Sequence, residues 1–150
     1  MPDVAVSHAD LLKGNQQDGH VLADSLGLLG SGSLRRFAVI GGRAIAAMER
    51  AAATSASLDA PPEWQPCRDE GPAFDAARKL AQSAAATTGL GLASVDTVTS
   101  RQGPIIVEIT TNLSIAQFER ICGATLADAI IVLLEKEARA KAIRIAAAQQ

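Results

Sequence analysis

The order of apolar and polar residues along the chain predicts two β-hairpins. The first spans 36–48, where two apolar runs flank the pair Gly41-Gly42, the turn signal of a two-residue hairpin. The second spans 92–109, where a strand-like segment and a β-branched run flank turn residues at 100–103. Strands joined in this way are expected to build an antiparallel sheet.

Two other segments have the spacing of helices. From Pro72 to Gly89 apolar residues recur every three or four positions, with proline suited to the first turn and glycine to the stop. The stretch 128–148 interleaves aliphatic and charged residues and predicts a long amphipathic helix. The segments 25–33 and 51–71 have no sustained period and are expected to be connections. The expected fold class is α/β (α+β), an antiparallel sheet from two β-hairpins with helices on one face.

Composition changes this picture little. With 150 residues, 48% hydrophobic and 20% charged, the chain suits one packed domain and not a disordered one. The 14 basic residues are scattered and balanced by 16 acidic ones, so we expect no nucleic-acid partner. No apolar run approaches the roughly 20 residues that span a bilayer, and the N-terminus has no leader pattern, so we expect a cytoplasmic protein without membrane contact. Two cysteines, Cys67 and Cys122, make neither a disulfide framework nor a zinc site.

The second hairpin is expected to bring two acids together. If its turn is centred on Gln102, then Val98 faces Ile106 and Asp96 faces Glu108. Side chains that face each other lie about 5 Å apart, where two full charges at an effective dielectric near 20 repel by about 3 kcal/mol. Such a pair requires compensation.

Because side-chain direction has period two, one face of this hairpin is apolar and the other carries oxygen ligands. Hard cations such as magnesium bind oxygen, commonly one or two carboxylates together with substrate phosphates. Magnesium with a nucleotide is therefore one interpretation. The alternatives are acids that point into water, and a register slipped by one residue that parts them. The polar face would carry Ser94, Asp96, Glu108 and Thr110.

The sequence of this hairpin resembles that of the RimK-like ATP-grasp ligases, which join a carboxylate to an amine through an acyl-phosphate intermediate. It reads GLASVD at 91–96 and GPIIVEIT at 103–110. The family has a G-V-D strand, followed at the same spacing by the glutamate of an E-V-N strand. The resemblance implies that Asp96, Glu108 and Thr110 ligate the magnesium that bridges the ATP phosphates, with Thr110 in place of the family's asparagine.

Two further blocks carry the resemblance. At 36–50 the chain reads RFAVIGGRAIAAMER, similar to the family hairpin R-x-F-V-I-G-G-K-V-V-A-A-M-x-R, which implies that Arg36 is the catalytic, phosphate-side arginine. At 14–24 it reads GNQQDGHVLAD, similar to the glycine-rich lid loop G-T-Q-G-x-G-V-x-L-A-E. The nucleotide-binding residues implied there are Gly14, Gln16 and Gly19. Two positions depart from the family, with Gln17 replacing a glycine and Asp10 standing where the ATP-binding lysine is placed.

The resemblance implies a remnant of the lid loop and a join over 1–33, followed over 34–150 by a region like the C-terminal subdomain of an ATP-grasp enzyme. The implied function is Mg-ATP binding by a domain that resembles ATP-dependent carboxylate-amine ligases of the alpha-L-glutamate type. The alternative is a non-catalytic, degenerate or split half that acts as a structural or interaction module. A second chain or a homodimer could complete the fold. The stripe of the helix at 128–148 would pack either on the sheet or on a second copy.

Overall fold

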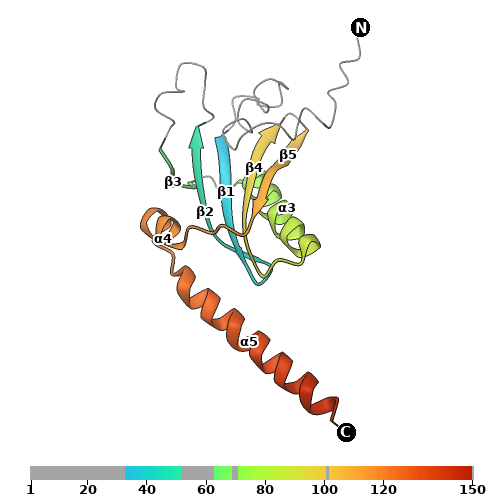
Figure 1. The fold of residues 1–150 in the computed structure, drawn as a ribbon. Coiled ribbons are helices and arrows are strands. Elements are labelled where there is room, and N and C mark those ends of the chain that lie inside the picture. The colour runs from blue at the N-terminus through green and yellow to red at the C-terminus, as the bar shows by residue number, and fades with distance from the viewer. Residues whose placement is uncertain (1–32, 52–62, 69–70, 101, 150) are drawn as a thin grey trace, which may run out of the picture.

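The computed structural model describes residues 33–51, 63–68, 71–100 and 102–149. These residues form one five-stranded sheet and three helices, with strand order β3-β2-β1-β4-β5 (Figure 1). Every strand pair is antiparallel. The expected class, α/β (α+β) with an antiparallel sheet, is confirmed. In chain order the elements are β1 Ser33–Ile40, β2 Arg43–Ala51, β3 Gln65–Pro66, α3 Pro72–Thr88, β4 Leu92–Ser100, β5 Gly103–Thr110, α4 Ile115–Cys122 and α5 Leu126–Ala147.

Both predicted hairpins are present. Gly41 and Gly42 form the turn between β1 and β2 with φ of 58° and 79°, the left-handed conformation that a two-residue hairpin turn needs and that glycine adopts without strain. Strands β4 and β5 form the second hairpin, and β1 pairs with β4 to join the two. The sheet gains one strand that the sequence did not predict, because Gln65–Pro66 pairs with the edge of β2 inside the stretch expected to be irregular.

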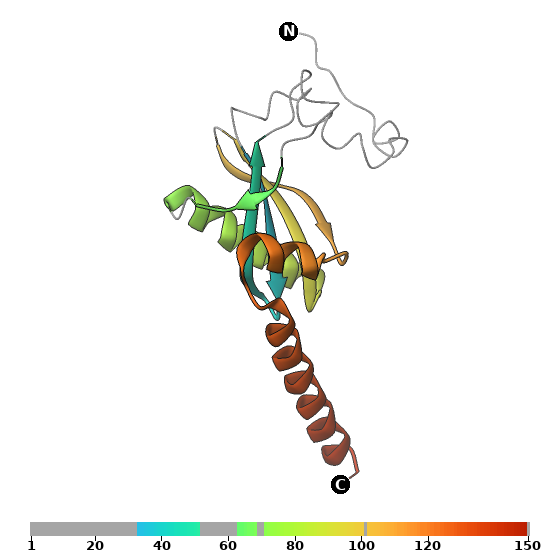
Figure 2. The ribbon, with the colours of Figure 1, turned by 90° about the vertical axis from the view of Figure 1, so that its left-hand side faces the viewer.

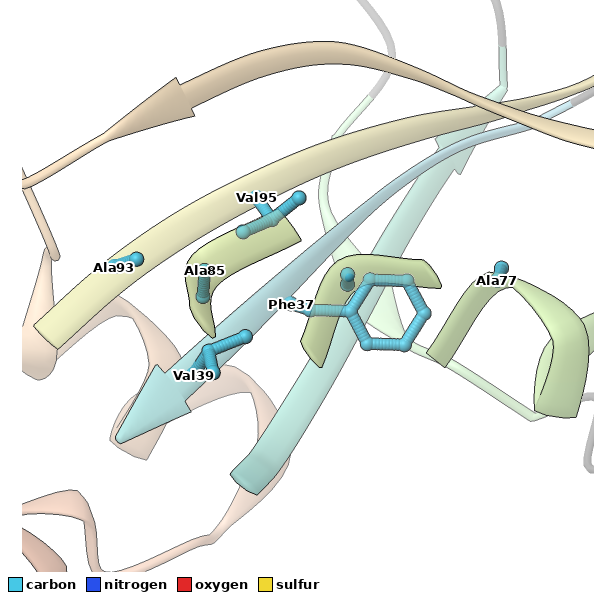
Figure 3. Close-up of a cluster of buried hydrophobic side chains, with 7 residues drawn as sticks. Phe37, Val39, Ala77, Ala85, Ala93 and Val95 are labelled. Carbon is cyan, nitrogen blue, oxygen red and sulfur yellow. The ribbon is translucent and has the colours of Figure 1, made fainter. Parts of the chain in front are cut away.

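Helix α3 covers one face of the sheet (Figure 1). Its inward side presents small alanines four residues apart, which pack on Phe37 and Val39 of β1 and on Val95 of β4 (Figure 3). The helix begins at Pro72 and ends at Gly89, whose φ of 69° caps it, as predicted. The fully buried alanines are Ala77, Ala81 and Ala85.

Helices lie on both faces of the sheet, whereas the sequence predicted helices on one face only. The side chains of Ala38 and Ile40 point away from α3 and pack with Phe118 of α4 and Leu126 of α5. The physical reason lies in β1, whose last four residues are apolar and buried. A strand with apolar side chains on both sides requires cover on both sides.

Helix α5 packs on the body only through its first turns and then runs away from the sheet (Figures 1 and 2). The helix was expected to pack either on the sheet or on a second copy. Packing within the chain is observed only for its first turns. Among the helices of the described residues, none is long and apolar enough to cross a membrane.

Candidate functional site

Three strands place Arg36, Asp96 and Glu108 in a row on one face of the sheet. Asp96 of β4 pairs with Arg36 of β1 on one side and with Glu108 of β5 on the other. The predicted opposition of the two acids is confirmed. This is the face opposite α3, because Ala38 of β1 and Leu92 of β4, an even number of positions from Arg36 and Asp96, lie in the α4 and α5 core.

The rest of the hairpin register differs from the prediction. Val98 pairs with Ile105 and not with Ile106, since the turn closes between Ser100 and Gly103. The register shifts between Asp96 and Thr97, which pair with Glu108 and Ile106. Val107 is therefore the extra residue of a β-bulge, and it is 39% exposed. The bulge restores the pairing of Asp96 with Glu108 that the tighter turn alone would have broken.

Asp96 is held by a two-pronged ion pair. The Nε and Nη2 atoms of Arg36 donate to Oδ1 and Oδ2 of Asp96, each at 2.7 Å. Asp96 is only 4% exposed, and about a quarter of the Arg36 side chain is exposed. The pKa of Arg36 is raised above its ordinary value because the side chain donates to Asp96, and the negative charges of Asp96 and Glu108 add to this, whereas burial opposes it. The arginine supplies the compensation that two neighbouring acids need.

An aromatic ring completes the basic side of the site. The guanidinium carbon of Arg36 lies 4.8 Å from the centre of the Trp64 ring, and that of Arg50 lies 4.7 Å from it. Burial lowers the pKa of Arg50, and the positive charge of Arg36 lowers it further. Sequence reasoning missed Trp64, which lies in a stretch without period. The only sequence signal for this part of the site was Arg50, the last residue of the block 36–50 that resembles the family hairpin.

The other implied ligands lie on β5. Glu108 is exposed, while Thr110 is half-buried and pairs with Ser94. The Thr110 hydroxyl oxygen accepts a hydrogen bond of 3.1 Å from the backbone N–H of Asn112. Four of the residues singled out in the lid region, Gly14, Gln16, Gly19 and Asp10, lie outside the described residues.

The chemistry of these donors fits magnesium. Asp96, Glu108 and Thr110 offer carboxylate and hydroxyl oxygens, the ligands that this hard cation takes. Each carboxylate oxygen has two acceptor positions, so the arginine leaves one free on each oxygen of Asp96. The set contains only two acids, and the described residues hold no group of three or more His, Cys, Asp or Glu that could hold a metal. A magnesium ion bound here would need further oxygens, such as those of phosphates.

No family model matches the chain. It is 30% identical over 134 residues to a probable alpha-L-glutamate ligase of Xanthomonas axonopodis pv. citri, a match that covers 81% of this chain and 41% of the relative. It is 36% identical over 63 residues to probable alpha-L-glutamate ligase 2 of Shewanella denitrificans, covering 42% of this chain and 21% of the relative.

Among solved structures, the chain is similar to the ATP-grasp ligase PsnB complexed with a phosphomimetic variant of its minimal precursor, Mg and ADP. The TM-score is 0.51 at 20% identity, over 71% of this chain and 34% of that one. PsnB with the minimal precursor alone gives the same TM-score at 19% identity. The described residues therefore share the fold of about a third of an ATP-grasp ligase. The resemblance to the RimK-like ATP-grasp ligases is confirmed, and the chain is a relative of the probable alpha-L-glutamate ligases that spans about two-fifths of the length of those first matched.

Proposed function

We propose that the face of the sheet bearing Arg36, Asp96 and Glu108 binds the phosphates of Mg-ATP, in a domain of the carboxylate-amine ligase kind. The observation that carries this proposal is the row of one arginine and two opposed acids on adjacent strands. The row lies in a chain that is related to probable alpha-L-glutamate ligases and has an ATP-grasp fold. A site for Mg-ATP needs both signs of charge at close range, because it must bind the phosphate oxygens and the cation together.

The basic side of the site suits phosphate. Arg36 and Arg50 both lie against Trp64, so two guanidinium groups are close enough that the charge of Arg36 lowers the pKa of Arg50. An anion between two such groups relieves their repulsion, and guanidinium forms paired hydrogen bonds with phosphate oxygens. We assign Arg36 the catalytic role, in which it would stabilise charge on the transferring phosphoryl group.

The acidic side suits the cation. Asp96, Glu108 and Thr110 would hold magnesium, which neutralises charge on the phosphates when it is bound. In the structure Arg36 holds both oxygens of Asp96 in place, while most of that residue is removed from water. Exposed Glu108 remains accessible from the solvent side. Gly14, Gln16 and Gly19 are proposed to cover the phosphates from the lid loop, and a second chain could supply the lysine that Asp10 replaces.

A second function is favoured by the same ion pair. Both oxygens of Asp96 already accept hydrogen bonds, so Arg36 and Asp96 could be a purely structural pair in a non-catalytic, degenerate ATP-grasp half. In that case the chain would act as a structural or interaction module. The two functions differ in one measurable property, the binding of Mg-ATP to the folded chain.

Thermal unfolding with added ligand separates them. A ligand that binds only the folded state stabilises it by RT ln(1 + [L]/Kd), so millimolar Mg-ATP should raise Tm. Magnesium alone and ATP with a chelator are the controls. Arg50→Gln should reduce the rise, whereas Lys79→Gln, which removes an equal charge from the exposed side of α3, should not. An unchanged Tm at millimolar Mg-ATP would favour the structural function.

A further inference from the structure

Helix α5 exposes large apolar side chains along the part that leaves the body. Ile131 is 55% exposed, Leu134 57% and Ile145 50%. The helix is anchored on the opposite side, where Leu126, Ile130 and other residues of its first turns pack with α4 and the sheet. Apolar side chains of this size on a helix that stands clear of its own domain are typical of a surface that binds another protein.

Ile131, Leu134 and Ile145 form one stripe with three alanines, whereas Val132, 64% exposed, and Ile143, 69% exposed, lie on another side of the helix. Members follow one another at spacings of four, three, four, four and three residues, which at 3.6 residues per turn places them all on one side of the helix. That side faces away from the residues that anchor α5 to the body. All members are exposed in the described structure, and the three alanines would let a second helix approach closely. The stripe consists of Ala127, Ile131, Leu134, Ala138, Ala142 and Ile145.

From Ile131 to Ile145 the spacing of the stripe reads the same in both directions about Ala138. If a second α5 runs antiparallel with the two-fold axis at Ala138, then Ile131 of each copy lies opposite Ile145 of the other. By the same arithmetic Leu134 lies opposite Ala142, and Ala138 lies opposite itself. Large side chains therefore meet at both ends of the contact and small ones at its centre, as the self-complementary surface of a two-fold dimer requires.

The charges beside the stripe follow the same symmetry. One flank carries Glu135 and Arg139, already an ion pair of 3.9 Å within the helix, and the other carries Glu137 and Lys141. In an antiparallel pair like flanks meet, so each flank brings the acid of one copy near the base of the other. In a parallel pair unlike flanks meet, and acids would lie near acids and bases near bases.

We infer that α5 is a dimerisation helix that pairs antiparallel with α5 of a second copy of this chain about a two-fold axis at Ala138. The occupant is a second copy because apolar pairing and charge pairing share one symmetry centre. This inference does not depend on the proposed nucleotide binding, which is assigned to the strands and not to the stripe of α5.

Disulfide trapping tests both the contact and its direction. Chains with Ile131→Cys are mixed with chains with Ile145→Cys, both in a background carrying Cys67→Ser and Cys122→Ser, and oxidised. The antiparallel pair should trap the mixed dimer and neither homodimer, because a disulfide needs Cα atoms within about 7 Å. Homodimers without the mixed dimer would overturn the antiparallel arrangement. Absence of any trapped dimer in chains with native circular dichroism would overturn the contact itself.

A charge exchange gives an independent test on the full chain. Glu135→Arg with Glu137→Lys makes the flanks basic, and Arg139→Glu with Lys141→Glu makes them acidic. In sedimentation at graded concentrations, each variant alone should remain near the 15.5 kDa of one chain, and their equal mixture should reach twice that mass. Wild type should also reach twice that mass. Wild type that stays at one chain at the highest concentration, or variants that associate as well alone as mixed, would overturn the proposal.

Discussion

The Arg36 guanidinium donates to both carboxylate oxygens of Asp96 across two neighbouring strands, at 2.7 Å each. This contact neutralises an acid that the fold has almost removed from water, beside a second acid on β5. It also places the arginine proposed to bind phosphate and the acid proposed to bind the cation within one hydrogen bond of each other. The stability of the sheet and the proposed chemistry therefore depend on the same two residues.

Removing the Asp96 charge should destabilise the protein. Asp96→Asn leaves the partly buried Arg36 without its counter-ion, and we expect the free energy of unfolding to fall by roughly 2 kcal/mol. Asp75→Asn is the matched control, since Asp75 pairs with Arg78 at 2.8 Å but both side chains are more than 40% exposed. It should cost no more than about 1 kcal/mol. Urea unfolding measures both values, and equal losses would show that burial of the Asp96 pair contributes little.

Glu108 should matter for the ligand and not for the fold. Glu108→Gln removes an exposed charge opposite Asp96, so the free energy of unfolding should stay within about 0.5 kcal/mol or rise slightly. Affinity for Mg-ATP should fall by at least about tenfold, equivalent to roughly 1.4 kcal/mol. Calorimetric titration and urea unfolding of the same variant measure the two effects. Clear destabilisation of the magnesium-free variant would identify Glu108 as a structural residue.

A larger side chain between α3 and the sheet should destabilise the protein. Ala81 is fully buried against the sheet, so Ala81→Leu is expected to cost about 1–3 kcal/mol of stability. Ala86 lies on the exposed side of the same helix, and Ala86→Leu should change stability by less than about 0.5 kcal/mol. Thermal and urea unfolding of the pair measure the difference. Similar stabilities of the two variants would contradict close packing of α3.

Cys67 should be a slow nucleophile. Burial, together with the charge of Glu49, which accepts the thiol hydrogen at 3.4 Å, raises the pKa of the thiol to about 12. The alkylation rate at pH 8 to 9 should therefore be far below that of the unfolded chain, and Glu49→Gln should increase it. Mass spectrometry of the Cys67 peptide measures the rate. A rate equal to that of the unfolded chain would contradict the burial of the thiol.

The same shift makes stability depend on alkaline pH. The unfolded thiol ionises near its ordinary pKa of 9.0 and the folded thiol near 12, so the contribution of Cys67 is fully present below pH 9. It is lost as pH rises from 9 to about 12. Cys67→Ser should remove this part of the pH dependence of the free energy of unfolding.

Local signals predicted the elements of the fold well. Gly41-Gly42, Pro72 and Gly89 act through backbone conformation that each residue carries by itself, and the structure uses each as predicted. The bulge at Val107 was not predicted. It is needed because the tight turn pairs Ser100 with Gly103 while Asp96 still pairs with Glu108, and sequence spacing does not show that both pairings occur. The second helical layer depends on tertiary packing, because the sequence does not show which helix covers which apolar side of β1.

The site was predictable only in part. The opposition of Asp96 and Glu108 follows from period-two geometry and turn position. That Arg36 pairs with Asp96 requires β1 to lie beside β4, and sequence spacing does not reveal which strands of two hairpins become neighbours. Trp64 reaches the site through β3, whose two residues are too short to carry a pattern.

The fluorescence of Trp64 during titration with Mg-ATP tests the proposed binding most directly. Trp64 is the single tryptophan of the chain and contacts both arginines assigned to the phosphates, so bound nucleotide must change its surroundings. We predict a saturable change in its emission with Mg-ATP that Glu108→Gln shifts to at least about tenfold higher concentration. Emission that is unchanged at millimolar Mg-ATP, in a chain whose native fold is verified by circular dichroism, would contradict nucleotide binding at this face.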